Sequence, residues 1–110
     1  MIDASLFEKL VQIRRDIHQH PETGFDVERT AALAADEVER LGFKVRRGVG
    51  RTGVVADWDI PGATERIALR ADMDALPMQE EGNPPYKSTV DGKAHMCGHD
   101  AHTAMLIGAA

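Results

Sequence analysis

The sequence is organised around one nine-residue stretch, His95-Met96-Cys97-Gly98-His99-Asp100-Ala101-His102-Thr103. It contains the only cysteine of the chain and three of its five histidines. A thiolate and an imidazole two positions apart can reach the same metal ion, and zinc and its neighbouring transition metals prefer these ligand types. The glycine between them can adopt a backbone conformation that other residues avoid, which favours a tight turn. The stretch therefore predicts a metal-binding turn.

The residues after this turn predict a helix. Asp100 is a good N-cap, and the run from 101 to 107 is mostly apolar, as at the start of a buried helix. The candidate ligands would then lie at a helix N-terminus, where backbone N–H groups favour a thiolate. Simpler interpretations exist: Cys97 as a small buried apolar side chain, Asp100 as only a cap, and His102 as a partly exposed first-turn residue. Two ligands do not complete a zinc site, so others must come from elsewhere.

Length and composition limit the function classes. With 110 residues the chain is at most one domain with a modest core. The net charge of -5 argues against nucleic-acid binding, and no apolar run is long enough to cross a membrane. We find no signal peptide, and a single cysteine excludes an internal disulfide, so we expect a cytoplasmic protein. The apolar helical pattern continues to Ala110 without a stop signal, which suggests an incomplete chain.

Two helices are expected in the first part of the chain. Apolar spacing over residues 6–17 predicts a helix that is capped by Ser5 and ends before Pro21. A second helix, rich in small residues, should begin at a cap on Asp26 and end at Gly42.

The histidines and glycines near these helices have alternative interpretations. His18 and His20 are either ligands or, more simply, imidazoles at a helix C-terminus. The glycine-rich residues 48–53 could be mistaken for a phosphate-binding loop, but no helix follows them and the Walker lysine is missing. We interpret them as a hairpin turn between strands at residues 43–46 and 54–58.

A third strand is predicted over residues 66–70, and its apolar core suggests a central position. Helices, strands and a further helix in this order predict an α/β domain with a mixed sheet. Ligands gather beyond the carboxyl ends of strands in such sheets, so Asp72 and Asp74 are candidate site residues. Asp74 could support a metal-bound histidine, and Asp72 could bind metal or support its neighbours. The alternative is a strand-end turn in which Asp72 pairs with Arg70.

A proline- and glycine-rich segment, residues 79–88, is expected to form a long loop. Glu80 and Glu81 lie in it. A pair of glutamates can include a general base, but in a loop we expect both to be solvated.

Three runs together resemble the N-terminal part of the M20 family of metallopeptidases: Arg14–Glu22, Arg70–Pro77 and Met96–Thr103. The branch is that of hippurate hydrolase, N-acyl-amino-acid amidohydrolases and plant auxin-conjugate hydrolases. The resemblance covers essentially the whole chain. It implies that residues 1–110 are the N-terminal portion of a three-layer α/β/α catalytic domain with a mixed sheet. It also implies hydrolysis of N-acyl amino acids, small-molecule substrates, at a site with two divalent ions (zinc, manganese, cobalt or nickel).

The resemblance also assigns roles to individual residues. Cys97 and His99 would be metal ligands, and Asp74 would be the catalytic-site carboxylate that supports the metal. Asp72, which stands where the wider family has a metal-binding histidine, joins Asp100 and His102 as candidate supporting residues. The resemblance places the catalytic glutamate and the remaining ligands outside residues 1–110, so the chain alone should be inactive. It also places there a lid domain used for dimerisation, so the whole protein should be a homo-oligomer.

Two other functions remain open from the residues alone. A non-enzymatic module could bind one metal ion, or complete its site with a second copy through an exposed sheet edge. A Cys-His thiol hydrolase is less well supported, because residues two apart on a turn rarely align for proton transfer.

Overall fold

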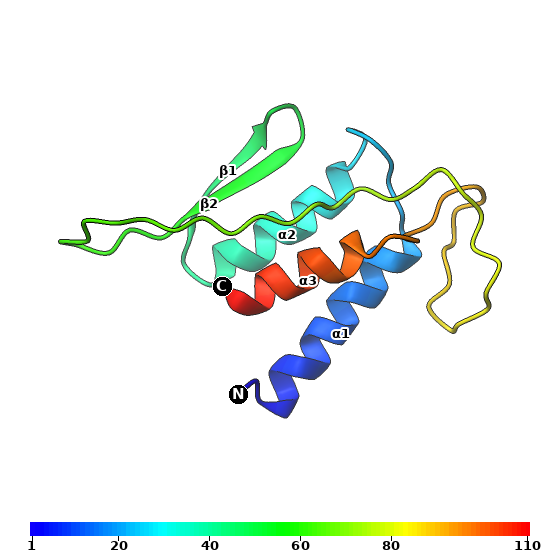
Figure 1. Cartoon of the computed structure of the whole chain (residues 1–110), viewed down its shortest axis with the longest axis horizontal. Helices are drawn as coiled ribbons and strands as arrows, with labels where there is room; N and C mark the ends of the chain where they lie inside the picture. The colour runs from blue at the N-terminus through cyan, green and yellow to red at the C-terminus, as the bar shows by residue number, and fades with distance from the viewer.

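The computed structural model describes all 110 residues. Its elements are α1 (Ala4–Gln19), α2 (Glu28–Arg40), β1 (Lys44–Val49), β2 (Gly53–Asp57) and α3 (His99–Ala109). Helix α3 packs against both α1 and α2, and the β1–β2 hairpin packs on α2 (Figure 1). The predicted α/β class is confirmed. No helix is long and apolar enough to span a membrane.

The core lies where α1 meets α3. Ile13 and Ile17 of α1 form a buried cluster with Ala104 and Ile107 of α3, so the predicted apolar face of the first helix is confirmed. The helices approach closely: a Cβ atom on Gly108 would lie 2.5 Å from a methyl carbon of Leu10. This packing holds the C-terminal helix, which carries the candidate site at its start, on the first helix.

Helix α1 begins two residues earlier than expected, and the prediction of Ser5 as its cap is wrong. Asp3 is the N-cap: its Oδ1 accepts hydrogen bonds from the backbone N–H of Leu6 at 2.8 Å and from the hydroxyl of Ser5 at 2.7 Å. The bond from the Leu6 N–H, and then that from the Ser5 hydroxyl, hold the pKa of Asp3 below its ordinary value.

This cap should make the first turn of α1 sensitive to acid. Because the pKa of Asp3 is lower in the folded state, its stabilisation is present above the unfolded pKa and is lost as the pH falls through the folded pKa. In Asp3→Asn the side-chain amide oxygen can still accept the Leu6 N–H, so helix α1 should persist. The stability of its first turn should then depend less on pH in the acid range. A ¹³C titration of the Asp3 carboxyl, compared with amide exchange at Leu6 in both proteins, measures this. An ordinary or raised pKa for Asp3 would contradict it.

The cap of α2 also differs from the prediction. Asp26 makes no capping bond, and the N-cap residue Val27 offers no side-chain acceptor. Instead Glu22 reaches the helix start from the preceding turn: its carboxylate accepts the backbone N–H of Arg29 at 3.1 Å and that of Thr30 at 2.7 Å. The Thr30 hydroxyl donates to the same carboxylate at 2.7 Å. The end of α2 is as predicted, since Gly42 adopts φ +100 after its last turn.

Glu22→Ala should destabilise the chain, while Asp26→Ala should not. Removing the Glu22 carboxylate leaves two N–H groups of the first turn of α2 without a partner, which costs about 0.5–2 kcal/mol at a typical cap. Asp26→Ala is the matched control, because it removes an exposed carboxylate from the same turn. Urea denaturation of both variants measures the difference. Equal losses of unfolding free energy in the two variants would refute this capping role of Glu22.

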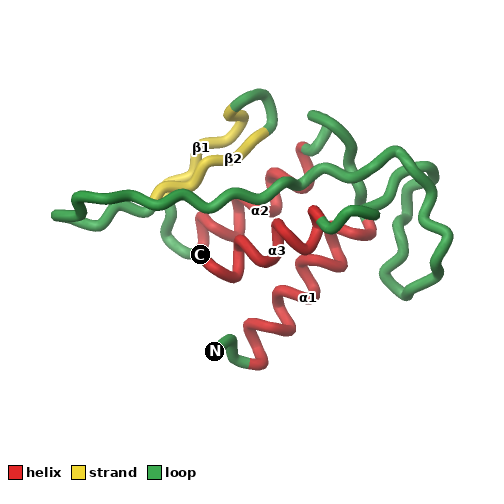
Figure 2. Tube along the Cα trace, in the orientation of Figure 1, coloured by secondary structure: helices red, strands yellow, loops and turns green.

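The predicted hairpin is confirmed, and the prediction of a third strand is wrong. β1 and β2 pair antiparallel, with Lys44 opposite Asp57, and the glycine-rich residues form the turn between them. Residues 66–70 belong to no strand and are exposed throughout. In Figure 2 they form part of a long loop that crosses the molecule. An extended segment becomes a strand only when a neighbour satisfies its backbone N–H and C=O groups, and residues 1–110 provide no such neighbour for this segment.

Candidate metal centre

The segment with the two candidate aspartates is fixed beside the start of α3 by backbone contacts. Leu76 and Ala94 form an antiparallel bridge, with N–H to O distances of 2.9 and 3.0 Å. On the other side, the hydroxyl of Thr103 in α3 donates to the carbonyl of Asp72 at 3.0 Å. The second and third sequence motifs are therefore neighbours in space, as predicted.

The Cys97–His99 turn depends on the glycine between the two residues. Gly98 has φ +122, in the region that favours glycine, and is itself the N-cap residue of α3. Its carbonyl accepts the N–H of His102 at 3.0 Å and so begins the helix. Cys97, just before it, is a free and exposed cysteine. The alternative of a buried apolar cysteine is wrong.

His99 is oriented by Asp74. Its Nδ1 lies 3.0 Å from the Asp74 carboxylate and 2.9 Å from the Asp74 carbonyl, so Nδ1–H donates to both oxygens. This contact leaves the lone pair on Nε2. The carboxylate of Asp72 lies near that nitrogen, at 3.7 Å, and also accepts from Arg70 at 2.7 Å. A carboxylate on one ring nitrogen, with the other nitrogen open, is the usual arrangement of a metal-binding histidine.

The donor set thus fits part of a metal centre. The chain offers an exposed thiol and an oriented imidazole, the donor types that suit zinc and similar ions. The side chain of His99 is 20% exposed, so its open nitrogen is accessible. No three His, Cys, Asp or Glu side chains of the chain lie close enough together to hold a metal ion. His102 is exposed, with its ring centroid 5.5 Å from that of His99.

Asp100 is not the helix cap that the sequence suggested. It lies in the first turn of α3 and is fully buried. Its Oδ1 accepts the N–H of Ala101 at 2.9 Å, while Oδ2 lies 2.8 Å from Arg14 Nε and 2.8 Å from His18 Nδ1. The prediction failed because both side-chain partners of Oδ2 come from α1, more than 80 residues earlier in the chain.

Glu80 was misjudged from the sequence, because it is buried and its Oε1 lies 2.7 Å from His18 Nε2. His18 lies in the last turn of α1, as predicted, but it is also buried and contacts two carboxylates. Glu81 is exposed, as expected. Two signals could have found this pair. His18 belongs to one of the three motif runs, and it directly follows Ile17, which lies on the buried face of α1.

His95 lies in the interior beside this cluster rather than in the candidate metal centre. Its ring centroid is 6.4 Å from that of His18, and both of its nitrogens are buried without a hydrogen-bond partner. Burial lowers the pKa of His95, and the nearby Asp100 carboxylate only partly offsets this effect. His95 is therefore neutral at pH 7.

The chain is similar in sequence to known proteins. Residues 68–110, which contain both aspartates and the Cys-Gly-His turn, match the model of peptidase family M20/M25/M40. The chain is 48% identical to hippurate hydrolase of Campylobacter jejuni, covering 94% of this chain and 26% of that protein. It is 46% identical to IAA-amino acid hydrolase ILR1-like 5 of Arabidopsis thaliana, covering 94% of this chain and 24% of that protein.

A solved structure extends the similarity to the fold. The Bacillus subtilis YXEP protein, described as a dinuclear metal binding peptidase from the M20 family, superposes with a TM-score of 0.90 at 39% identity. The match covers 96% of this chain and 30% of that one. The present chain spans about a quarter of the length of the curated relatives it matches. In its motifs, its fold and its sequence, the chain resembles proteins of peptidase family M20/M25/M40.

Proposed function

We propose that this chain is part of a metal-dependent amidohydrolase that cleaves the amide bond of N-acyl amino acids. The observation that carries the proposal is the contact between His99 Nδ1 and Asp74, which leaves Nε2 open next to an exposed cysteine. The names of the two relatives support the substrate class, because hippurate and IAA-amino acids are both N-acyl amino acids. The description of YXEP as dinuclear supports two divalent ions, for which zinc, manganese, cobalt and nickel are the candidates.

In this proposal Cys97 and His99 are ligands and Asp74 is the residue that orients His99. The Asp74 carboxylate accepts from Nδ1–H, so in the neutral ring Nε2 presents its lone pair. The Cys97 thiolate adds a negative charge that offsets part of the charge of the ions. Asp72 lies beside the open nitrogen, where it can bind metal or support the ligands. When bound, the divalent ions supply polarisation of the scissile carbonyl and a water of lowered pKa.

The proposal also covers what lies outside residues 1–110. We propose that the chain is the N-terminal portion of the catalytic domain, and that the general base and further ligands are contributed by other residues. The whole protein would be a cytoplasmic homo-oligomer. The 110 residues alone hold at most half of a coordination sphere and should not turn over substrate.

The test is hydrolysis of N-acyl amino acids by the full-length protein that contains this chain. The proposal expects metal-dependent release of the free amino acid, loss of activity with a chelator, and recovery on adding a divalent ion. Activity should be lost in Cys97→Ala and His99→Ala and kept in the control His20→Gln, because the part-exposed His20 ring contacts only Asp16, through Nδ1. The proposal fails if hydrolysis is indifferent to the chelator, or if the isolated chain turns over substrate.

A self-associating metal-binding module is the second candidate. It is favoured by Ile67 and Leu69, which are 89% and 63% exposed in an extended segment without strand partners. Such a segment is a template for pairing with another chain. The mass of the chain in solution and its metal stoichiometry discriminate: one tightly held ion per two chains favours the module, and weak binding by a monomer favours the enzyme fragment.

A further inference from the structure

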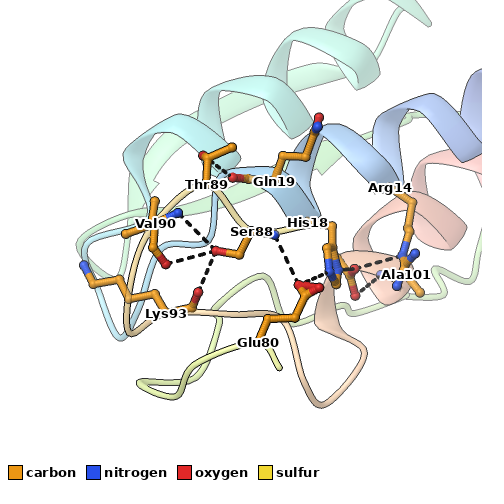
Figure 3. A network of polar contacts seen from close by, with 10 residues as sticks. Arg14, His18, Gln19, Glu80, Ser88, Thr89, Val90, Lys93 and Ala101 are labelled. Atoms are coloured by element: carbon orange, nitrogen blue, oxygen red, sulfur yellow. Dashed lines mark hydrogen bonds and ion pairs between the residues drawn. The ribbon is translucent and has the colours of Figure 1, made fainter. Parts of the chain in front are cut away.

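His18 links the two segments that build the candidate metal centre. Figure 3 shows His18 beside Glu80 and near Arg14 and Ala101. His18 lies in the last turn of α1. Its Nδ1 contacts Asp100, the residue directly after His99, and its Nε2 contacts Glu80, in the loop that follows Asp74. One imidazole therefore links the helix start that carries the Cys97–His99 turn to the segment that carries the aspartates.

When both carboxylates are ionised, the two contacts have His18 donating from both nitrogens. Each faces a carboxylate oxygen, at 2.8 Å for Asp100 and 2.7 Å for Glu80, and an ionised carboxylate only accepts. The other neighbours of these carboxylates are donors as well: Arg14 Nε at 2.8 Å from Asp100, and the N–H of Ser88 at 3.2 Å from Glu80. With His18 as imidazolium, the two cations and two carboxylates sum to zero charge.

Burial makes this link hard to replace. His18, Asp100 and Glu80 are 5%, 0% and 5% exposed. Solvent water therefore cannot replace a hydrogen bond that is lost among them. The edge of the Tyr86 ring packs on His18 at 5.5 Å between centroids, and Arg14 lies over the same ring at 5.1 Å. A doubly protonated imidazole presents one donor at each end of this space.

We propose that His18 is a positioning residue for the metal centre, which holds the Cys97–His99 turn and the Asp72–Asp74 segment at a fixed separation by donating to Asp100 and Glu80. Its effect on metal binding rests on the proposed function, whereas its double donation does not. His99 depends on this separation, because its ring must reach Asp74 across the gap between the two segments. Without the link, each segment keeps its own backbone contacts, but their relative position is less restricted.

The experiment is a Co²⁺ titration of the full chain, followed by the absorption of thiolate-bound Co²⁺, in the wild type, His18→Gln and His20→Gln. Glutamine at 18 can serve one carboxylate but not both. Residues that orient metal ligands typically contribute about 10–100-fold in metal affinity. We expect His18→Gln, at a temperature where circular dichroism shows it folded, to bind Co²⁺ at least about tenfold more weakly. His20→Gln, the histidine two residues along, should bind like the wild type.

The outcomes separate this inference from the proposed function. A folded His18→Gln chain with wild-type Co²⁺ affinity overturns the inference and leaves the proposed function intact. A wild-type spectrum that is unchanged in Cys97→Ser overturns the proposed function instead. Should His18→Gln fail to fold, Glu80→Ala releases the same link from its other end and must weaken Co²⁺ binding in the same direction.

The double donation has its own test, which needs no metal. In ¹⁵N-labelled wild type, both ring N–H protons of His18 should be visible and slow to exchange. Glu80→Ala should remove the Nε2–H signal while keeping that of Nδ1–H. Detection of only one protonated ring nitrogen in the wild type overturns the assignment.

Discussion

Asp100→Ala is expected to lower the free energy of unfolding by about 3–5 kcal/mol, the typical effect of removing one partner from a buried ion pair. The carboxylate of Asp100 is fully buried and faces both Arg14 and His18. Removing it leaves Arg14 without its carboxylate partner and the buried Nδ1 of His18 without an acceptor, so that only Glu80 still contacts His18. Domains are commonly stable by only about 5–15 kcal/mol, so much of the chain should unfold at low urea.

The matched control for this prediction is Asp36→Ala. Asp36 pairs with Arg47 at 2.7 Å on the surface, where both side chains are about half exposed, and Arg47 keeps a second partner in Glu39. Such surface pairs contribute about 0–1 kcal/mol. Urea denaturation of both variants measures the contrast. If Asp100→Ala costs no more than Asp36→Ala, the buried cluster does not hold α3 on α1.

The second large effect concerns the metal centre in the full-length protein. His99→Ala should reduce metal-dependent hydrolysis to background, because it removes a ligand. The effect of Asp74→Asn on hydrolysis should be smaller. The amide oxygen can still accept Nδ1–H of His99, but the negative charge that makes the imidazole a better ligand is lost. We expect metal affinity in Asp74→Asn to fall by about 10–100-fold, with activity recovered at high metal concentration.

Metal titrations of activity in both variants check this difference. Asp26→Asn is the control, because it neutralises an exposed aspartate that contacts neither the turn nor the 72–76 segment. Failure of excess metal to restore Asp74→Asn would contradict a purely orienting role for Asp74. Full activity in His99→Ala would remove His99 from the site.

Local patterns predicted the parts of the fold that depend on neighbouring residues. The apolar spacing of α1, the glycine after α2 and the hairpin turn each follow from a few consecutive positions. The same holds for the turn at Gly98, where only the backbone freedom of glycine is needed. Asp74 does lie beside His99, but the strand at residues 66–70 from which this was predicted does not form. The Leu76–Ala94 bridge and the bond from Thr103 to the Asp72 carbonyl bring the two segments together instead.

The features that sequence reasoning missed depend on distant residues or on absent partners. His18 meets Asp100 and Glu80 across 82 and 62 positions, a separation at which no periodic pattern links residues. The cap of α2 comes from Glu22, outside the usual capping position, because the turn folds its carboxylate back onto the helix start. Residues 66–70 have the composition of a strand, but composition does not supply a hydrogen-bonding neighbour.

The central claim is that the sulfur of Cys97 binds a divalent ion together with His99. X-ray absorption at the zinc edge, on zinc-loaded full-length protein, tests this directly. The account predicts a sulfur neighbour at about 2.3 Å from zinc in the wild type, replaced by lighter N or O neighbours in Cys97→Ser. A wild-type spectrum with only N and O neighbours, or one that Cys97→Ser leaves unchanged, would contradict it.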